Sequence, residues 1–280
     1  MMKRILVPVD FSRDSINALE HSIYYANSIN AALRMIYVKK NENFDPTFME
    51  DSESIKLETV KDYFNILHER YKDKIKSEQF DYKIREGIIY REVTNQAKYD
   101  DAHFIMMGTH GVSGFQDYWI GSNAFRVVSN APCPVITIRY GFDNKQLQKM
   151  VIPIDLSHLS RSKVPFVADF AKEFGVETHI VAVYETKSDE VVSRINQYAR
   201  QAYDYISSKG VTCVFESLSG ENITNVTIEY AEEKGAGLIA IMTEQTENVN
   251  NIWMGSYAQQ MVNRSPVPVM SIRPNVVKNE

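Results

Sequence analysis

The chain has 280 residues, of which 44% are hydrophobic and 24% charged, and its formal net charge is −5. These values are typical of a globular protein and exclude a disordered chain. No apolar run approaches the length of a membrane span, and the interspersed charges argue against the basic face that nucleic-acid binding requires. Residues 1–4 lead directly into a strand-like run without a signal peptide, so we expect a cytoplasmic protein.

The sequence contains an internal repeat that divides it into two halves. Residues 3–12 align with residues 148–157 without a gap, and residues 131–139 align with residues 265–273. Each half is long enough to build its own hydrophobic core. The predicted domains are residues 1–141 and 148–274.

The two cysteines do not occupy equivalent positions in the repeat. Cys133 lies in the first half and Cys213 in the second. This arrangement suggests neither a disulfide framework nor a metal cluster. We expect both cysteines to be small, buried side chains.

Strand-like and helical patterns alternate along the first half. Residues 5–9 form a continuous apolar run of strand length, and apolar residues then recur at helical spacing. The helical positions are Ile16, Leu19, Ile23, Ala26 and Ile29. Later strands are expected at 33–38, 82–85, 104–107 and 135–139, and later helices at 57–71, around 93–97 and from 122.

The second half repeats this order of elements. A strand at 151–154 precedes a helix marked by Val164, Ala168, Ala171 and Phe174, and a longer helix runs through residues 192–206. Strands separated by helices imply a parallel sheet that is covered on both faces. The predicted fold class is therefore α/β, with two tandem doubly wound domains. Each is expected to be a five-stranded parallel sheet flanked by helices.

A glycine motif follows the fourth predicted strand of the first half. Gly108-Thr-His-Gly111 is followed by nine residues and then by Gly121-Ser122. Glycine permits close approach of the backbone to a phosphate, and a helix that begins at Ser122 directs free amides and its positive dipole end toward an anion. In doubly wound sheets, ligands bind outside the carboxyl ends of the strands. The motif therefore predicts a phosphate-binding crevice.

Two residues near this crevice have competing interpretations. Asp10 could bind ribose hydroxyls or a base edge, but it could equally cap the following helix. Its counterpart Asp155 persists in the second half, which favours a partly structural role. His110 could meet a phosphate or could be an exposed loop residue.

The motifs at 8–10, 108–122 and 131–135 resemble the universal stress protein family, specifically its tandem two-domain members. The resemblance implies an adenine nucleotide alpha hydrolase-like fold for each domain. In that family, the pattern Gly-x-x-Gly, nine residues, Gly-Ser/Thr marks the members that bind ATP. The resemblance implies that one set of residues surrounds adenine and ribose: Pro8, Val9, Asp10, Val38, Met107 and Gly108. It implies that a second set surrounds the phosphates: His110, Gly111, Gly121, Ser122 and Asn123.

The second half departs from the pattern at its decisive positions. Met242 replaces Gly108, and Gln245 replaces Gly111, although Gly255-Ser256 is retained. Glu244 in place of His110 adds a negative charge where phosphates would lie. We therefore predict one ATP, ADP or AMP per chain, with Mg²⁺, in the first domain.

A connection unique to the first half leaves the second strand beside this crevice. This connection, residues 39–52, is longer than the corresponding connection in the second half, residues 185–189. One hypothesis is a lid in which Phe44 or Phe48 shields the base and Lys39 or Lys40 approaches the phosphates. The alternative is an acidic surface loop.

The last strand of each half is short, apolar and introduced by Pro-x-Pro. Such a strand at a sheet edge needs a covering partner, and universal stress proteins typically pair through it. We expect an internal pseudo-dimer of the two domains, with homodimers of the whole chain as a further option.

Three functional classes remain in consideration. The first is an ATP-binding stress-response regulator whose activity is binding itself. The second is an enzyme such as a slow ATPase; rapid turnover is not expected, because the sequence has no Walker Gly-Lys-Ser/Thr motif and no evident acid and base pair. The third is a stress scaffold that binds no nucleotide.

Overall fold

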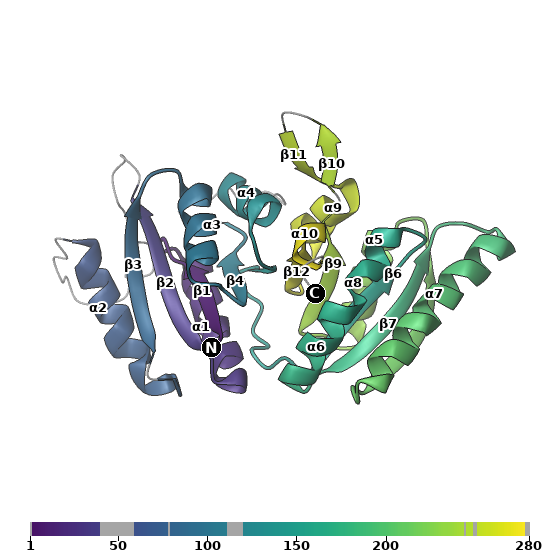
Figure 1. The fold of residues 1–280 in the computed structure, drawn as a ribbon, viewed down its shortest axis with the longest axis horizontal. Helices are drawn as coiled ribbons and strands as arrows, with labels where there is room; N and C mark the ends of the chain where they lie inside the picture. The colour runs from purple at the N-terminus through teal and green to yellow at the C-terminus, as the bar shows by residue number, and fades with distance from the viewer. Residues whose placement is uncertain are drawn as a thin grey trace. The chain divides into compact units, whose positions relative to one another are not determined.

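The chain folds into two compact units, Met1–Gly141 and Phe142–Glu280, called the first and second unit below. The computed structural model describes residues 2–39, 59–77, 79–110, 120–243, 245–248 and 251–277. Strands and helices alternate along each unit (Figure 1).

The first unit contains five described strands and four described α-helices. The strands are β1 (Arg4–Pro8), β2 (Ala32–Lys39), β3 (Phe80–Glu86), β4 (Phe104–Gly108) and β5 (Val135–Ile138). The helices are α1 (Arg13–Ile29), α2 (Val60–Tyr71), α3 (Ile89–Tyr99) and α4 (Ser122–Asn130), with a 3₁₀ turn, η2, at Lys72–Lys74.

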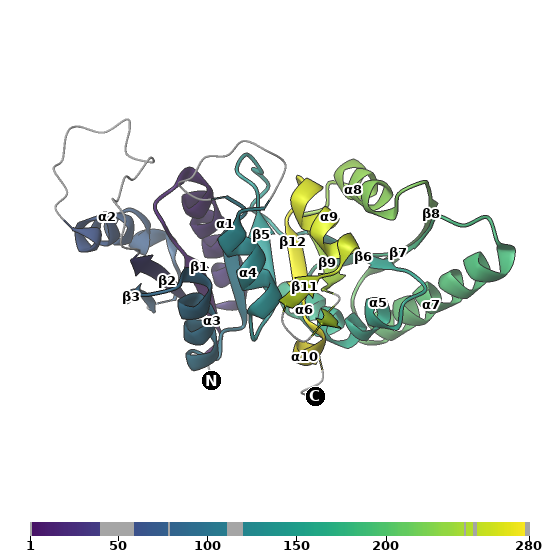
Figure 2. The same cartoon turned by 90° about the horizontal axis from the view of Figure 1, so that it is seen from above.

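The strands of the first unit form a parallel sheet in the order β3-β2-β1-β4-β5. Helices α1 and α2 cover one face of this sheet, and α3 and α4 cover the other (Figure 2). A strand that is covered on both faces must be apolar throughout, and Ile5, Leu6 and Val7 of β1 are fully buried. The predicted doubly wound α/β fold is confirmed.

The ends of α1 follow from local sequence signals. Ser12 is the N-cap, and its hydroxyl oxygen accepts a hydrogen bond from the amide of Ser15 at 3.2 Å. The helix ends at Asn30, which adopts the left-handed conformation with φ of 51°. These two caps fix the position at which the chain leaves β1 and enters the helix.

The second unit repeats this plan. Its described strands are β6 (Lys149–Ile154), β7 (Glu177–Tyr184), β8 (Cys213–Ser219), β9 (Leu238–Met242), β10 (Gln245–Asn248), β11 (Asn251–Met254) and β12 (Val269–Ile272). Its described helices are α5 (His158–Ser162), α6 (Val164–Phe174), α7 (Asp189–Ser208), α8 (Ile223–Glu233), α9 (Ser256–Arg264) and α10 (Pro274–Val277).

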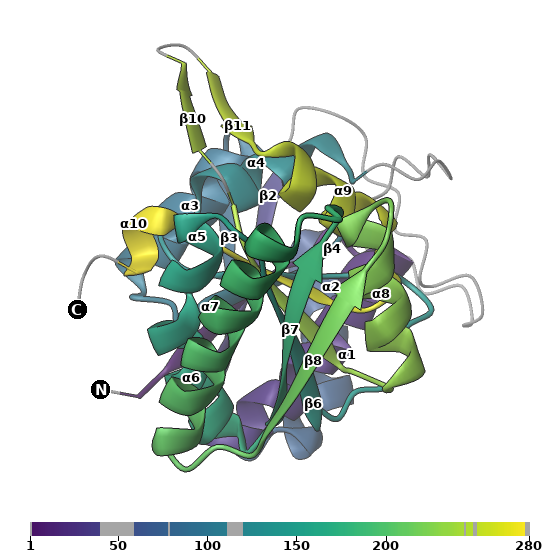
Figure 3. The same cartoon turned by 90° about the vertical axis from the view of Figure 1, so that its right-hand side faces the viewer.

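The parallel strands of the second unit lie in the order β12-β9-β6-β7-β8, which matches the first unit strand for strand. Helices α6 and α7 lie on one side of β6, β7 and β8, and α8 lies on the other (Figure 3). The order of strands therefore reverses at the same place in both units, between β1 and β4 and between β6 and β9.

The second unit differs from the sequence-based expectation in two places. The helix predicted from Val164 to Phe174 is α6, but an additional short helix, α5, precedes it, and Pro165 in the first turn of α6 favours a separate helix start. Strands β10 and β11 form an antiparallel hairpin in a segment for which the sequence analysis predicted no element. Cys133 is buried as expected, whereas Cys213 is partly exposed at the start of β8, the outermost strand in the unit's order. Among the described helices, none has the length and apolar character to cross a membrane.

Candidate functional site

The predicted site lies where three neighbouring parallel strands of the first unit end. β1 is flanked by β2 and β4, and Pro8 pairs with Ile36, two residues before Val38. The amide of Val9 continues the ladder by donating to the carbonyl of Ile36 at 2.9 Å. Met107 and Gly108 end the adjacent β4. The reversal of strand order between β1 and β4 makes this edge the position at which doubly wound sheets bind ligands.

Asp10 organises the turn that leaves β1. One of its carboxylate oxygens accepts hydrogen bonds from the Ser12 amide at 3.1 Å and the Ser12 hydroxyl at 2.6 Å. Asp155 makes the same two bonds with Ser157, at 2.8 and 2.7 Å. The shared arrangement is a structural role for this aspartate in both units.

Phe11 fixes the same turn from below. It has a φ of 63°, a left-handed conformation that is rare for a bulky residue and costs about 1–3 kcal/mol. Its fully buried ring lies 5.0–5.6 Å from the ring centres of Tyr37, Tyr63 and Phe64. This aromatic packing compensates the backbone strain and holds Asp10 at the carboxyl end of β1.

Gly108 is required by packing. A Cβ atom at Gly108 would lie 2.8 Å from the Asp14 Cβ and 2.9 Å from the Asp14 carbonyl carbon and oxygen. Because two of these atoms belong to the backbone of α1, they cannot move aside cheaply. The first turn of α1 therefore packs directly on the end of β4, and any larger residue at position 108 would separate them.

His110 and Asp14 form a polar pair beside Gly108. The His110 Nδ1 atom lies 2.9 Å from the Thr109 hydroxyl and 3.8 Å from an Asp14 carboxylate oxygen. Burial raises the pKa of Asp14, although the charge of His110 and the amides of Tyr140 and His110 partly offset that rise. His110 Nε2 is buried and has no hydrogen-bond partner among the described residues. A buried nitrogen atom without a hydrogen-bond partner is suited to binding a ligand group such as a phosphate oxygen.

The N-terminus of α4 is joined to the end of β4. The amide of Gly121 donates to the carbonyl of Thr109 at 2.8 Å, and a Cβ on Gly121 would lie 3.2 Å from that oxygen. Gly121 is the N-cap and supplies no side-chain cap, so the amides of the first turn, where Ser122 and Asn123 lie, are not satisfied by a capping side chain. Such amides attract anions.

Part of the prediction falls outside the described residues. This is the case for Gly111 and for residues 40–52 of the hypothetical lid, whereas Lys39 is the exposed last residue of β2. Two polar residues near the crevice were missed, Asp14 and Tyr37. Burial raises the pKa of Tyr37, and the charge of Asp10 adds to this effect. The position of Tyr37, one residue before Val38, was the signal available in the sequence.

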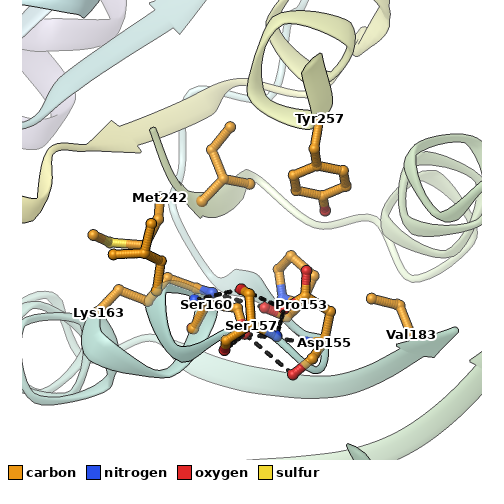
Figure 4. Close-up of a pocket in the computed structure, with 10 residues that line it drawn as sticks. Pro153, Asp155, Ser157, Ser160, Lys163, Val183, Met242 and Tyr257 are labelled. Carbon is orange, nitrogen blue, oxygen red and sulfur yellow. Dashed lines mark hydrogen bonds between the residues drawn. The ribbon is translucent and has the colours of Figure 1, made fainter. Parts of the chain in front are cut away.

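The second unit has a small cavity at the corresponding strand ends (Figure 4). It is lined by counterparts of predicted first-unit residues: Pro153 for Pro8, Asp155 for Asp10, Val183 for Val38, Ile241 for Met107, Met242 for Gly108 and Tyr257 for Asn123. Its volume of about 20 Å³ has room for about one water molecule. Met242, Lys163 and Tyr257 occupy this crevice where the first unit carries Gly108, Ala18 and Asn123.

Side chains that could hold a metal ion directly do not cluster in the described part of the chain. No group of three or more histidine, cysteine, aspartate or glutamate residues is found there in a suitable arrangement.

Two doubly wound units in tandem, each with polar residues at the strand ends where the strand order reverses, define the structural class of the chain. A family model described as the universal stress protein family matches residues 1–139 and again residues 146–273. The chain therefore belongs to the universal stress protein family, as a tandem two-domain member.

Individual relatives agree with this assignment. Universal stress protein MJ0531 of Methanocaldococcus jannaschii is 31% identical over 143 residues, which are 50% of this chain and 83% of that protein. Universal stress protein YxiE of Bacillus subtilis is 26% identical over 50% of this chain and 100% of its own length. A universal stress protein structure from Archaeoglobus fulgidus matches 96% of this chain and 98% of that one, with a TM-score of 0.68 and 19% identity. The last likeness concerns the fold alone.

Proposed function

We propose that the first unit binds one adenine nucleotide, ATP with Mg²⁺ or else ADP or AMP, and that the chain acts as a cytoplasmic stress-response regulator through this binding. The proposal rests on a difference between the side chains at corresponding strand ends of the two units. The first unit has Gly108, Ala18 and Asn123 where the second has Met242, Lys163 and Tyr257. The second unit fills its strand ends with side chains that the first unit does not carry at these positions.

The polar groups of the first unit fit the chemistry of such a ligand. The free amides of α4 and the Nε2 atom of His110 suit phosphate oxygens. Asp10, Pro8, Val9, Val38, Met107 and Gly108 are assigned to the nucleoside, and Gly111, Gly121, Ser122 and Asn123 to the phosphates. Mg²⁺ would bind together with the nucleotide, since most of its ligands in such sites are phosphate oxygens and water molecules.

The experiment that tests this proposal is identification of the small molecules released when the purified chain is denatured. We expect about one adenine nucleotide per chain, measured by chromatography and mass spectrometry. Two nucleotides per chain would contradict the distinction between the units. No nucleotide, together with no thermal stabilisation by ATP and Mg²⁺, would instead favour the scaffold function. Release of ADP at a measurable steady rate would favour the slow ATPase.

Asp10 and Asp155 offer a matched pair of variants. Asp10→Ala and Asp155→Ala each remove the same two hydrogen bonds to a helix-capping serine. Each should lower the free energy of unfolding of its own unit by about 1–2 kcal/mol, measured by urea denaturation. Only Asp10→Ala should also weaken nucleotide binding, by about tenfold or 1.4 kcal/mol in calorimetric titration. Equal affinities in the two variants would restrict Asp10 to its structural role.

We also propose that the units pair as an internal pseudo-dimer through β5 and β12. Each is the outer strand in the order of its own unit, and an outer strand offers unpaired backbone groups to a partner. A homodimer of the whole chain would be a second level of assembly, which the mass from light scattering distinguishes from a monomer.

A further inference from the structure

Lys163 is a lysine at a position that the repeat otherwise fills with alanine. It lies six residues after the helix-capping Ser157, as Ala18 lies six residues after Ser12. Lys163 joins α5 to α6, and its residue surface is only 1% exposed. An ammonium group in such a place loses its hydration and needs compensation.

The hydrogen bonds of Lys163 match the neutral amine better than the ammonium ion. Its Nζ atom donates to the carbonyl of Pro153 at 2.7 Å and to the carbonyl of Ser160 at 2.6 Å. A neutral amine has two hydrogens, and both therefore have acceptors. An ammonium ion has three, and the described residues supply no third hydrogen bond to Nζ.

The cavity beside Lys163 can supply the missing acceptor. Tyr257 directs its hydroxyl into the cavity, and that buried oxygen has no hydrogen-bond partner among the described residues (Figure 4). The Thr227 hydroxyl near Tyr257 gives its hydrogen to the carbonyl of Ile223 at 2.6 Å, so it does not donate to the Tyr257 oxygen. With a volume of about 20 Å³ and Asp155 also in its wall, the cavity has the space and polar groups for one water molecule.

Burial, partly opposed by one nearby charge, places the titration of Lys163 near neutral pH. Burial lowers the pKa of Lys163 to about 7, although the nearby Asp155 carboxylate favours the charged form. Asp155 remains ionised, because hydrogen bonds from Ser157 and Ser160 outweigh the effect of its own burial and lower its pKa. Burial raises the pKa of Tyr257, which stays neutral. The lining side chains from β7 and β9 are uncharged: Val183, Ile241 and Met242.

We propose that the crevice of the second unit is a proton-binding site, in which Lys163 takes up a proton and one water molecule in the cavity accepts its third hydrogen. The water in turn contacts the Tyr257 hydroxyl and the Asp155 carboxylate. The site occupies the same strand ends at which the first unit carries its proposed nucleotide crevice. The two units would then respond to different inputs, a nucleotide in one and acidity in the other.

The sign of the effect on stability follows from linkage. The unfolded chain holds the Lys163 proton up to a pH of about 10.4, whereas the folded chain releases it near pH 7. Between these values the unfolded chain binds more protons, so the stability of the second unit should rise with pH. Below pH 7 both forms are protonated, and this contribution no longer changes.

The direct test is a titration of the full-length chain labelled with ¹³C at lysine Cε, followed by NMR from about pH 5.5 to pH 10. We expect one Cε resonance to titrate near pH 7, well below the ordinary lysine value of about 10.4. That resonance should disappear in Lys163→Met, and it should remain in Lys209→Met. Lys209 is a suitable control because it is half-exposed beside Asp169, whose charge raises the pKa of Lys209.

Two outcomes would overturn the proposal. One is that every lysine resonance of the unmodified chain titrates above about pH 9.5; the other is that the resonance near pH 7 persists in Lys163→Met. If Lys163→Met does not fold, Lys163→Ala reproduces the residue of the first unit and serves the same assignment. Tyr257→Phe removes the hydroxyl that contacts the water, so the midpoint should fall by about half a pH unit. An unchanged midpoint in Tyr257→Phe would exclude the water-filled cavity from the site.

Discussion

Gly108→Met is expected to abolish nucleotide retention by the first unit. A Cβ at this position meets the Asp14 Cβ at 2.8 Å and backbone atoms of Asp14 at 2.9 Å, so α1 must move away from β4. Overpacking of this kind typically costs about 1–3 kcal/mol of stability. Because the contact is with backbone atoms, we expect a cost of about 3 kcal/mol. The rest of the methionine side chain would enter the crevice. We expect nucleotide affinity to fall at least about 100-fold, or about 2.7 kcal/mol, in calorimetric titration.

The second unit provides the matched control for this substitution. Met242 occupies the corresponding strand end and lines the cavity. Met242→Ala should cost its unit about 2–5 kcal/mol in urea denaturation, because it enlarges a buried cavity. It should leave the nucleotide content of the chain unchanged. Wild-type affinity in Gly108→Met would contradict the assignment of Gly108 to the site, whereas lost affinity in Met242→Ala would show that the second unit takes part in binding.

The fold was predictable because its signals are local and repeated. The run at residues 5–9 predicts a strand buried on both faces, and the apolar spacing after it predicts α1. The same pattern predicted which edge of the sheet carries the candidate site, since parallel strands place their carboxyl ends together. Pro8 and Gly108 are far apart in sequence, yet they end neighbouring strands.

The features that sequence analysis missed depend on contacts between distant elements. Asp14 resembles any acidic residue in the first turn of a helix until Gly108 is seen beneath it. The apolar residues that follow Lys163 keep their helical spacing without it. The hydrophobic pattern of the sequence therefore gives no sign that Lys163 is buried. Pro165 was the available signal for the division of the helix. The hairpin of β10 and β11 is short, and the polar sequence of β10 gives little strand signal.

A second large effect is expected at the opposite ends of the strands, where Arg34 of β2 joins two carboxylates. Its guanidinium donates two hydrogen bonds to Asp81, both at 2.6 Å, and one to Asp100 at 2.6 Å. The Asp100 side chain is 1% exposed and that of Arg34 is 10% exposed. The hydrogen bonds that Arg34 donates to Asp81 are the main reason why the pKa of Arg34 is raised. Arg4 also approaches Asp100, at 3.4 Å.

Asp100→Ala should therefore lower the free energy of unfolding of the first unit by about 3 kcal/mol, measured by urea denaturation. Removing one partner of a buried ion pair leaves the other charge without compensation, which typically costs 3–5 kcal/mol. The cost should lie at the lower end of this range because Asp81 still pairs with Arg34. Asp81→Ala should cost less, about 1 kcal/mol, because its side chain is 48% exposed and solvent screens the pair.

A double variant separates the charge from the packing. Arg34→Met combined with Asp100→Leu removes both charges and keeps apolar volume, so it should recover most of the stability that Asp100→Ala loses. The second unit has His179 and Lys234 at the corresponding positions, and His179 instead contacts Tyr230 at 2.8 Å and Glu177 at 2.9 Å. The unfolding of that unit should not change in any of these variants. A cost below about 1 kcal/mol for Asp100→Ala would mean that water replaces the lost carboxylate, and that the ion pair is not a determinant of the fold.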